Sequence, residues 1–538
     1  MNLGIFSAAQ VSDIPSFKAR TELISVPVVV TDKSGAHIHG LAKEDFQLFE
    51  EGKEMSLAVF EEITNAHRPA PDASSQSAQF TNVRTGNASV QQLTLIALDQ
   101  INTTPEDQIY AREQLQQFLA DPVNAGLPVS LFTVGRTGVK LIHHFSSDSK
   151  SLIAALKDTD RGRPPVVEEK PWAFLPDGND RLNKIHEEMG EFQVDADQVS
   201  SSFDRRTAVT VTLQALQQIA QACAGLPGRK NLVWASGGFP FVLNEVSMTL
   251  KEGGGAADTP ANVLPLYQQT WSALNQAQVA VYPVDAHGLA DLPGPATERV
   301  NKALQDPFTH GQFLRAGNIG TFETFAHATA GRAYYNRNNL KAAVQQAADD
   351  SSSYYLLGFY LDHNDTKPGW RKLEVKVKRD EVQVLARTGF FVDVPSTHEQ
   401  DDARDQVEMA LNSPLDFTAI RISGKWQDVQ SAEKGKKKVI FVLTMPANFA
   451  DVDESHGNHF QVDFWVRAWD KHGEVAGNVT QSMQGNFNDA MLRRFQSNGT
   501  DYRGALTLPP GEYKVRFVVR DRLSGRMGSV VSPVKVEK

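Results

Sequence analysis

The stretch Leu93-Thr-Leu-Ile-Ala-Leu-Asp99 decides the fold that we expect for the middle of this chain. It is a mostly apolar run of strand length that ends at a carboxylate, and such runs are typical of parallel strands buried on both faces. Two similar runs, Asn231–Ala235 and Val279–Val284, end at a serine and an aspartate, and segments of helical pattern lie between the runs. Alternating strands and helices predict an α/β domain with a doubly wound, mostly parallel sheet over residues 91–350.

The segments on either side of this domain have the patterns of antiparallel strands. Ile24, Val26, Val28 and Val30 alternate with other residues, and three more strand-like runs lie between residues 354 and 391. Neither set has enough strands for a stable sheet, so we expect them to complete one β unit. The predicted organisation is therefore an export-signal remnant or disordered tail (1–20), an N-terminal β unit (21–65), a linker (66–90), the α/β domain (91–350), strands completing the β unit (351–395), a linker (396–413) and an all-β sandwich, immunoglobulin-like or fibronectin type III-like (414–538).

Composition excludes several classes of protein. The chain has 538 residues, 41% of them hydrophobic and 22% charged, which is ordinary for globular domains and excludes a mostly disordered chain. The longest apolar runs are of strand length, so the sequence predicts no transmembrane segment. A formal net charge of −10 makes it a poor generic binder of nucleic acid. The single cysteine, Cys223, lies at helical spacing from apolar residues and is interpreted as a core residue.

The first ten residues leave two interpretations open. Ser7 and Ala9 are small residues at the −3 and −1 positions before Gln10, as at the cleavage site of an export signal. The basic and long apolar regions of such a signal are absent, so the signal would be truncated by a late start codon. The alternative is an ordinary frayed terminus. The first interpretation predicts an extracytoplasmic protein, periplasmic or secreted.

Hydroxyl and carboxylate side chains collect where the strands of the predicted sheet end. Asp99 and Thr103 follow the first buried strand, Thr207 begins a predicted helix, and Ser236 ends a later strand. Ligands of such sheets bind at the carboxyl ends of the strands. Oxygen ligands of this kind suit a hard cation. The alternative role for Asp99 is to cap the turn that follows it.

Several longer stretches together resemble the von Willebrand factor A-related proteins of the Acidobacteria type. The resemblance covers residues 20–395 and rests on Val28-Val-Val-Thr-Asp-Lys-Ser-Gly35, Gly40-Leu-Ala-Lys-Glu-Asp-Phe46, Gly225-Leu-Pro-Gly-Arg-Lys-Asn-Leu-Val-Trp-Ala-Ser-Gly-Gly-Phe-Pro240, Val281-Tyr-Pro-Val-Asp-Ala-His-Gly288 and Tyr354-Tyr-Leu-Leu-Gly-Phe-Tyr360. It implies a Rossmann-like von Willebrand A fold, an exported location and a binding function. The sandwich resembles only a generic module, through Leu508–Val515.

The resemblance also implies a metal-ion-dependent adhesion site, of the form Asp-x-Ser-x-Ser with a Thr and an Asp from later loops. Asp99 matches the first Asp, but Ile101 takes the first Ser position and cannot ligate. Thr103 replaces the second Ser, Thr207 matches the loop Thr, and Ser236 stands where the later Asp belongs. The implied cofactor is Mg²⁺ or another divalent cation, held by a degenerate site. Asn102 and Asp285 are neighbours on the same partner-binding edge.

These observations favour a non-enzymatic protein. Ser236 precedes a glycine as in a nucleophile elbow, but Trp234 stands where that motif needs glycine. A triad with His287 is the least favoured interpretation. We expect an exported adhesion protein that recognises a protein partner through the carboxyl-end loops of the sheet. The alternative is a metal-independent scaffold of the cell envelope, and a hydrolase comes third. Oligomeric state is not predicted.

Overall fold

The computed structural model describes most of the chain. The described residues are 21–64, 80–82, 93–103, 105–124, 126–159, 196–238, 264–286, 310–335, 340–362, 369–392, 399–432 and 435–537. The tail 1–20 and most of the region 160–206 lie outside them, and so does His287. Within the described part, the strands form one five-stranded sheet and four four-stranded sheets.

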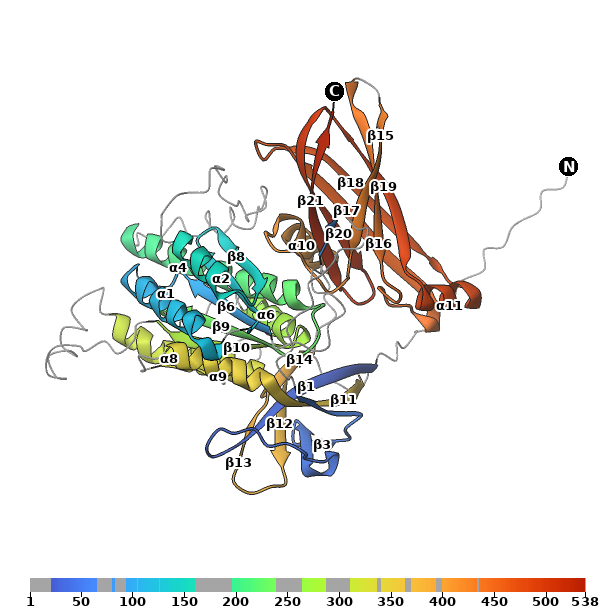
Figure 1. Ribbon diagram of the computed structural model, residues 1–538. Helices are drawn as coiled ribbons and strands as arrows, with labels where there is room; N and C mark the ends of the chain where they lie inside the picture. Colours follow the sequence, from blue (N-terminus) through green and yellow to red (C-terminus); the bar gives the residue numbers. More distant parts are fainter. Residues whose placement is uncertain are drawn as a thin grey trace.

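Leu93–Asp99 forms strand β6 at the centre of the five-stranded sheet, as its apolar pattern predicts (Figure 1). All of its residues are buried. The strand order is β10-β9-β6-β7-β8, with β10 (Val279–Asp285), β9 (Lys230–Ser236), β7 (Val129–Gly135) and β8 (Gly138–Ser146). The first three junctions are parallel, whereas β7 and β8 are antiparallel. The carboxyl ends of β6, β9 and β10 therefore meet at one edge.

Helices cover both faces of this mixed sheet, because successive side chains of each buried strand point to opposite faces. Ile96 and Leu98 pack with one set of helices, and Leu95 and Ala97 pack with the other. The first set is α1 (Pro105–Ala120), α2 (Ser149–Asp158) and α9 (Leu340–Ser352), and the second is α4 (Ala196–Cys223), α6 (Leu264–Gln276) and α8 (His310–Thr329).

The predicted fold class is nevertheless wrong for this chain. Among the described residues, antiparallel strands dominate, and parallel pairing is confined to one mixed sheet of the five. The mixed character has a local cause: only Arg136 and Thr137 separate β7 from β8, and so short a connection permits only antiparallel pairing. The chain is therefore mostly β with one mixed, helix-covered sheet, instead of a doubly wound parallel α/β protein.

Two four-stranded sheets form the β unit below the mixed sheet in Figure 1. They share one apolar core, in which Val28 and Leu48 are fully buried. Segments that precede and follow the mixed sheet in the sequence build each of these two sheets, and all of the pairs are antiparallel. One sheet has β13 (Val382–Leu385), β1 (Thr21–Asp32), β11 (Ser353–Asp362) and β4 (Val59–Thr64), and the other has β14 (Gly389–Val392), β12 (Gly369–Val377), β2 (Phe46–Glu50) and β3 (Lys53–Met55).

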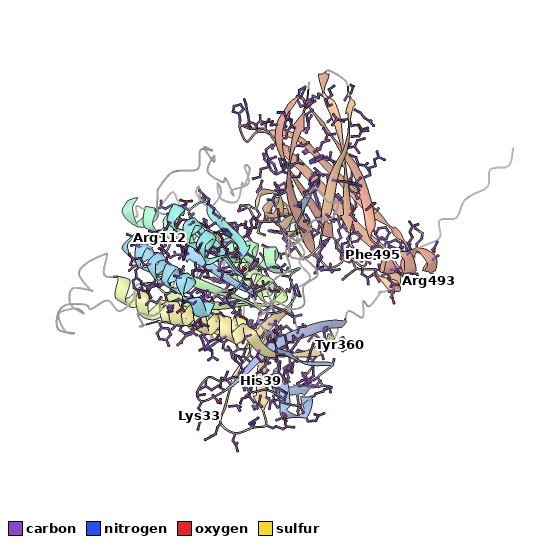
Figure 2. The ribbon with its side chains drawn as sticks, viewed as in Figure 1. Lys33, His39, Arg112, Tyr360, Arg493 and Phe495 are labelled. Atoms are coloured by element: carbon purple, nitrogen blue, oxygen red, sulfur yellow. The ribbon has the colours of Figure 1, made fainter. Side chains whose placement is uncertain are left out.

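The C-terminal part is a sandwich of two four-stranded antiparallel sheets. The Phe441 and Phe517 rings meet between the sheets with their centroids 4.9 Å apart. The short helix α11 (Asp489–Ser497) carries Phe495, which is labelled in Figure 2. The Phe495 ring packs on Phe449 and Phe487 and anchors the helix. One sheet is β19 (Thr500–Leu508), β16 (Lys437–Met445), β15 (Ser423–Ser431) and β5 (Phe80–Thr81), and the other is β18 (Val475–Asn486), β17 (His459–Trp469), β20 (Gly511–Asp521) and β21 (Met527–Val536).

Strand β5 comes from the segment predicted to be a linker. Phe80 packs its ring against Phe517 of the sandwich core at 5.2 Å. Asn82 is buried: its Nδ2 donates to the carbonyls of Phe417 (2.7 Å) and Ile420 (2.8 Å), and its Oδ1 accepts from Ile422 N (2.8 Å). The chain therefore passes through the sandwich before it enters the mixed sheet.

A second junction joins the sandwich to α4. Thr418 N donates to Gln221 O at 3.1 Å, and Gly225 N donates to Thr418 Oγ1 at 2.9 Å. The backbones lie so close that a Cβ on Gly225 would be 1.7 Å from Thr418 O. The predicted linker 396–413 is also structured, because it contains α10 (Glu399–Asn412).

Candidate functional site

Asp99 is the centre of the candidate site, at the carboxyl end of β6. Its side chain is buried, and each carboxylate oxygen accepts two hydrogen bonds. Oδ1 accepts from the backbone N–H groups of Ile101 and Asn102, both at 3.0 Å. Oδ2 accepts from Asn102 Nδ2 at 2.8 Å and Ser236 Oγ at 2.7 Å. A carboxylate has about four lone-pair positions, so all of them are in use.

The hydrogen bonds tie the loop after β6 to the loop after β9. Gly237 N donates to Thr103 Oγ1 at 2.9 Å. The Ser236 hydroxyl has a second acceptor, Gly238 O at 2.7 Å, and a hydroxyl donates to one acceptor at a time. Asn102, expected only as a neighbour, is therefore a central member of this cluster.

Burial and hydrogen bonding oppose each other at Asp99. Burial removes water from the carboxylate and raises its pKa above the ordinary value, and this effect outweighs the hydrogen bonds from Asn102, Ser236 and Ile101, which lower the pKa. The carboxylate therefore binds a proton more readily in the folded chain than in water.

The threonine that reaches this cluster is Thr212, not Thr207. Asn102 Nδ2 donates to Thr212 Oγ1 at 3.2 Å, and Thr212 is fully buried. Helix α4 begins at Ala196, so Thr207 lies inside the helix, where it is exposed. The sequence held a signal for this residue: Thr212 is a polar residue on the apolar face that includes Val209, Leu213 and Leu216.

Asp285 ends the neighbouring strand β10, opposite Ser236 in register. Its backbone N donates to Tyr334 O at 2.8 Å, and Ala286 N donates to Ser236 O at 2.9 Å. Asp285 therefore lies on the same edge of the sheet, beside the strand end that carries Ser236.

The cluster does not fit a divalent cation in this arrangement. Its one carboxylate has no unused lone pair, and the Thr103 hydroxyl already accepts a hydrogen bond. In the described part of the chain, no group of three or more His, Cys, Asp or Glu residues could hold a metal ion. The Mg²⁺ site implied by the resemblance thus stays a prediction without geometric support.

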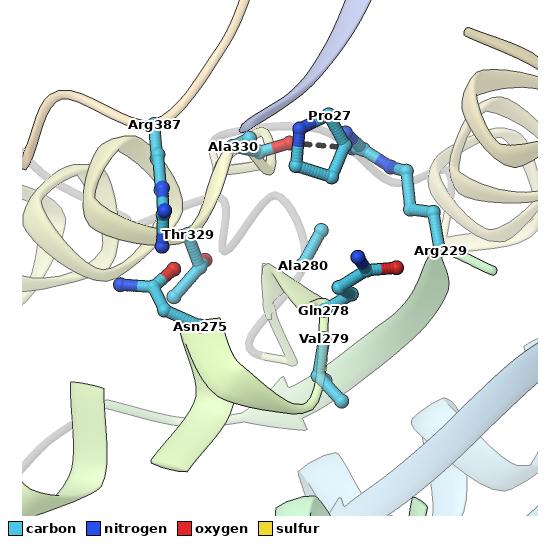
Figure 3. Close-up of a pocket in the computed structure, with 9 residues that line it drawn as sticks. All are labelled: Pro27, Arg229, Asn275, Gln278, Val279, Ala280, Thr329, Ala330 and Arg387. Carbon is cyan, nitrogen blue, oxygen red and sulfur yellow. Dashed lines mark hydrogen bonds between the residues drawn. The ribbon is translucent and has the colours of Figure 1, made fainter. Parts of the chain in front are cut away.

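A small cavity lies at the opposite end of the sheet, near the start of β10 (Figure 3). Its volume is about 10 Å³, enough for about one water molecule. The wall includes Arg229, whose Nη2 donates to the carbonyl of Ala330. This cavity is too small for a ligand, and it lies far along the strands from Asp99.

Comparison with known proteins identifies no family. No family model matches the chain, and no curated protein matches it. A glycosyl hydrolase family 2 member from Bacteroides cellulosilyticus DSM 14838 is 10% identical over 34% of this chain and 20% of that one, with a TM-score of 0.16. The TFIIH p34 N-terminal domain is 12% identical over 48% of this chain and 97% of that one, with a TM-score of 0.19. The match spans about a fifth of the hydrolase, and TM-scores this low support no conclusion about fold or function.

No helix within the described residues is long and apolar enough to cross a membrane.

Proposed function

We propose that this chain is an exported binding protein that recognises a protein partner, without a metal ion, through the carboxyl edge of the mixed sheet. We call this edge the rim and define it as the two loops that Asp99, Asn102, Thr103, Ser236 and Gly237 hold together. The observation that carries the proposal is the buried Asp99 carboxylate with its four hydrogen bonds.

Burying a charge is costly unless hydrogen bonds compensate it, so the carboxylate needs its full set of hydrogen-bond donors for the folded arrangement to be stable. Its effect is to hold two loops of different strands in one arrangement. A rim held in this way loses little conformational entropy when a partner binds, which favours affinity. Crevices at the carboxyl ends of parallel strands are also the usual binding positions in such sheets.

The geometry around Ser236 gives less support to a hydrolase. Ser236 is fully buried, and the described acceptors of its hydroxyl are a carboxylate and a backbone carbonyl. A nucleophilic serine needs a base and an exposed oxygen. The resemblance to von Willebrand A-related proteins and the export-signal remnant remain predictions from the sequence, and the second of these supplies the exported location in the proposal.

Site-specific photo-crosslinking tests the proposal. A crosslinking residue at Thr207 is exposed and lies about 7.5 Å along α4 from Thr212, at a rise of about 1.5 Å per residue. The control position is Lys425, exposed on the sandwich. We expect one discrete protein of the cell envelope to be linked from Thr207 and not from Lys425.

The linked partner is then titrated against variants of the full chain. Ser236→Ala removes one hydrogen bond to Asp99, and we expect about tenfold weaker binding, corresponding to about 1.4 kcal/mol. Ser482→Ala, at an exposed position of β18, is the matched control. If Ser236→Ala and wild type are both folded and bind the partner with equal affinity, the rim is not the binding site. Crosslinks from Lys425 alone would favour the scaffold interpretation instead.

A further inference from the structure

A larger recess lies along the β10 side of the mixed sheet. Residues 331–335 extend the sheet beyond β10: Tyr334 N donates to Pro283 O, and Asp285 N donates to Tyr334 O, both at 2.8 Å. Between this segment, α8 and β13 is a cavity of about 390 Å³. The side chains that matter here are Glu323, His327, Arg332, Tyr334, Tyr335 and Leu385. Its volume lies in the range of small-ligand pockets, at the lower end.

The wall of this recess is built under backbone constraint. Ala330 has a φ of 61°, in the left-handed region that a non-glycine residue seldom adopts. Arg229 holds it there through the carbonyl of Ala330, the bond drawn in Figure 3, and Gly331 N closes the end of α8 by donating to Ala326 O at 2.8 Å. A Cβ on Gly331 would lie 1.8 Å from Val281 O, so only glycine fits.

Arg332 is oriented by a buried acid. Its Nε donates to Asp350 Oδ2 at 3.0 Å, and Asp350 also accepts from Tyr282 OH at 3.0 Å. No described residue accepts a hydrogen bond from the terminal amino groups of Arg332. The Arg332 side chain is 30% exposed and lines the recess, so these donors are accessible to a ligand.

Glu323 is the matching acceptor on α8. Tyr335 OH donates to Glu323 Oε1 at 2.6 Å, which fixes the carboxylate against the tyrosine ring. His327 lies four residues later on the helix, so it neighbours Glu323 on the same face, and it is exposed. The recess thus combines a fixed donor, a fixed acceptor and an aromatic ring.

The charges that line the recess balance. Arg332 carries one positive charge and Glu323 one negative charge, so the formal sum with a neutral histidine is zero. A strongly charged ligand would gain little net attraction here. A neutral molecule with several hydroxyl groups matches the fixed donor and acceptor, and its apolar ring face matches the aromatic wall.

We propose that this recess binds a small neutral saccharide of one or two rings, with hydroxyl groups on Glu323 and Arg332 and a ring face on Tyr335. The recess shares no lining residue with the rim and lies beside β10 of the same sheet.

Saturation-transfer NMR of the full chain, followed by calorimetry, tests this inference. The probes are glucose, galactose, maltose, cellobiose and inorganic phosphate. We expect at least one of the sugars to bind, Glu323→Gln to weaken its binding at least tenfold, and Tyr335→Ala to abolish it. Tyr335→Phe keeps the ring but loses the hydrogen bond that fixes Glu323, so its affinity should lie between those of wild type and Tyr335→Ala. Glu512→Gln, at an exposed glutamate of the sandwich, is the matched control and should bind like wild type.

Three results would overturn the inference. The first is no saturation transfer to any of the four sugars. The second is sugar binding that Glu323→Gln and Tyr335→Ala, both folded by circular dichroism, leave unchanged. The third is binding of phosphate alone, which would make the recess an anion site on Arg332 and His327.

Discussion

Replacing Asn82 by alanine tests whether strand β5 secures the sandwich to the rest of the chain. The Asn82 side chain makes three buried hydrogen bonds, to Phe417 O, Ile420 O and Ile422 N. A buried hydrogen bond contributes about 1 kcal/mol net, so the loss is about 3 kcal/mol. The backbone bond from Asn82 N to Ile422 O, at 3.1 Å, is still available to the variant.

Hydrogen exchange measured by mass spectrometry is the suitable assay, because a chain of several sheets need not unfold in one step. Local opening that costs about 3 kcal/mol less should speed exchange about 150-fold in the peptide 417–424. Asn478→Ala, at an exposed position of β18, is the matched control and should leave this peptide unchanged.

The reasoning fails if Asn82→Ala stays folded and its 417–424 peptide exchanges within about twofold of wild type. That result would mean that Phe80 alone, or the Thr418 junction, holds the sandwich. Faster exchange in peptides throughout the chain would also contradict the reasoning, since the three hydrogen bonds lie within the sandwich.

Three further outcomes are expected. Mg²⁺, Mn²⁺ and Ca²⁺ should give no saturable heat in calorimetry, because all four acceptor positions of the Asp99 carboxylate are in use. A saturable heat that disappears in Asp99→Asn would show that this carboxylate can still bind a cation. The folded-state pKa of Asp99 is raised by burial, so the stabilisation linked to its proton is complete below about pH 4 and is lost as pH rises through that pKa. Urea midpoints of Asp99→Asn should therefore rise relative to wild type as pH increases above about pH 4, and a constant difference would refute this. Burial raises the pKa of Cys223 to about 12, so at pH 8 its thiol should react with dithionitrobenzoate only in denaturant, whereas prompt reaction of the native chain would refute its burial.

Local pattern was enough to locate the central strands. The apolar runs at Leu93–Asp99 and Val279–Asp285 are strands because both of their faces are buried, and that burial leaves a continuous apolar signature in the sequence. The end of each run also placed Asp99, Ser236 and Asp285 at one edge of the sheet. The hydroxyl of Thr103 belongs to the same local group, since it lies four residues after Asp99.

Local pattern failed where partners come from distant parts of the chain. Phe80–Thr81 is too short to be recognised as a strand. It forms because it pairs with the edge of β15, more than 300 residues later, where Gly424 has no side chain and leaves space for the Phe80 ring. Thr207 has the right residue type, but the extent of α4 places Thr212 opposite Asn102 instead.

By itself, the sequence determined the buried strands, the alternating strands of the sandwich and the residues that end at the rim. These properties depend on side-chain periodicity, which is a local property of the chain. Only the tertiary structure decided that four of the five sheets in the described part are antiparallel and that β5 enters the sandwich. It also decided that the Asp99 oxygens accept hydrogen bonds from Asn102, Ser236 and the backbone. Those outcomes depend on which distant groups meet, because pairing and burial are set by packing between segments and not by the order of residues within one of them.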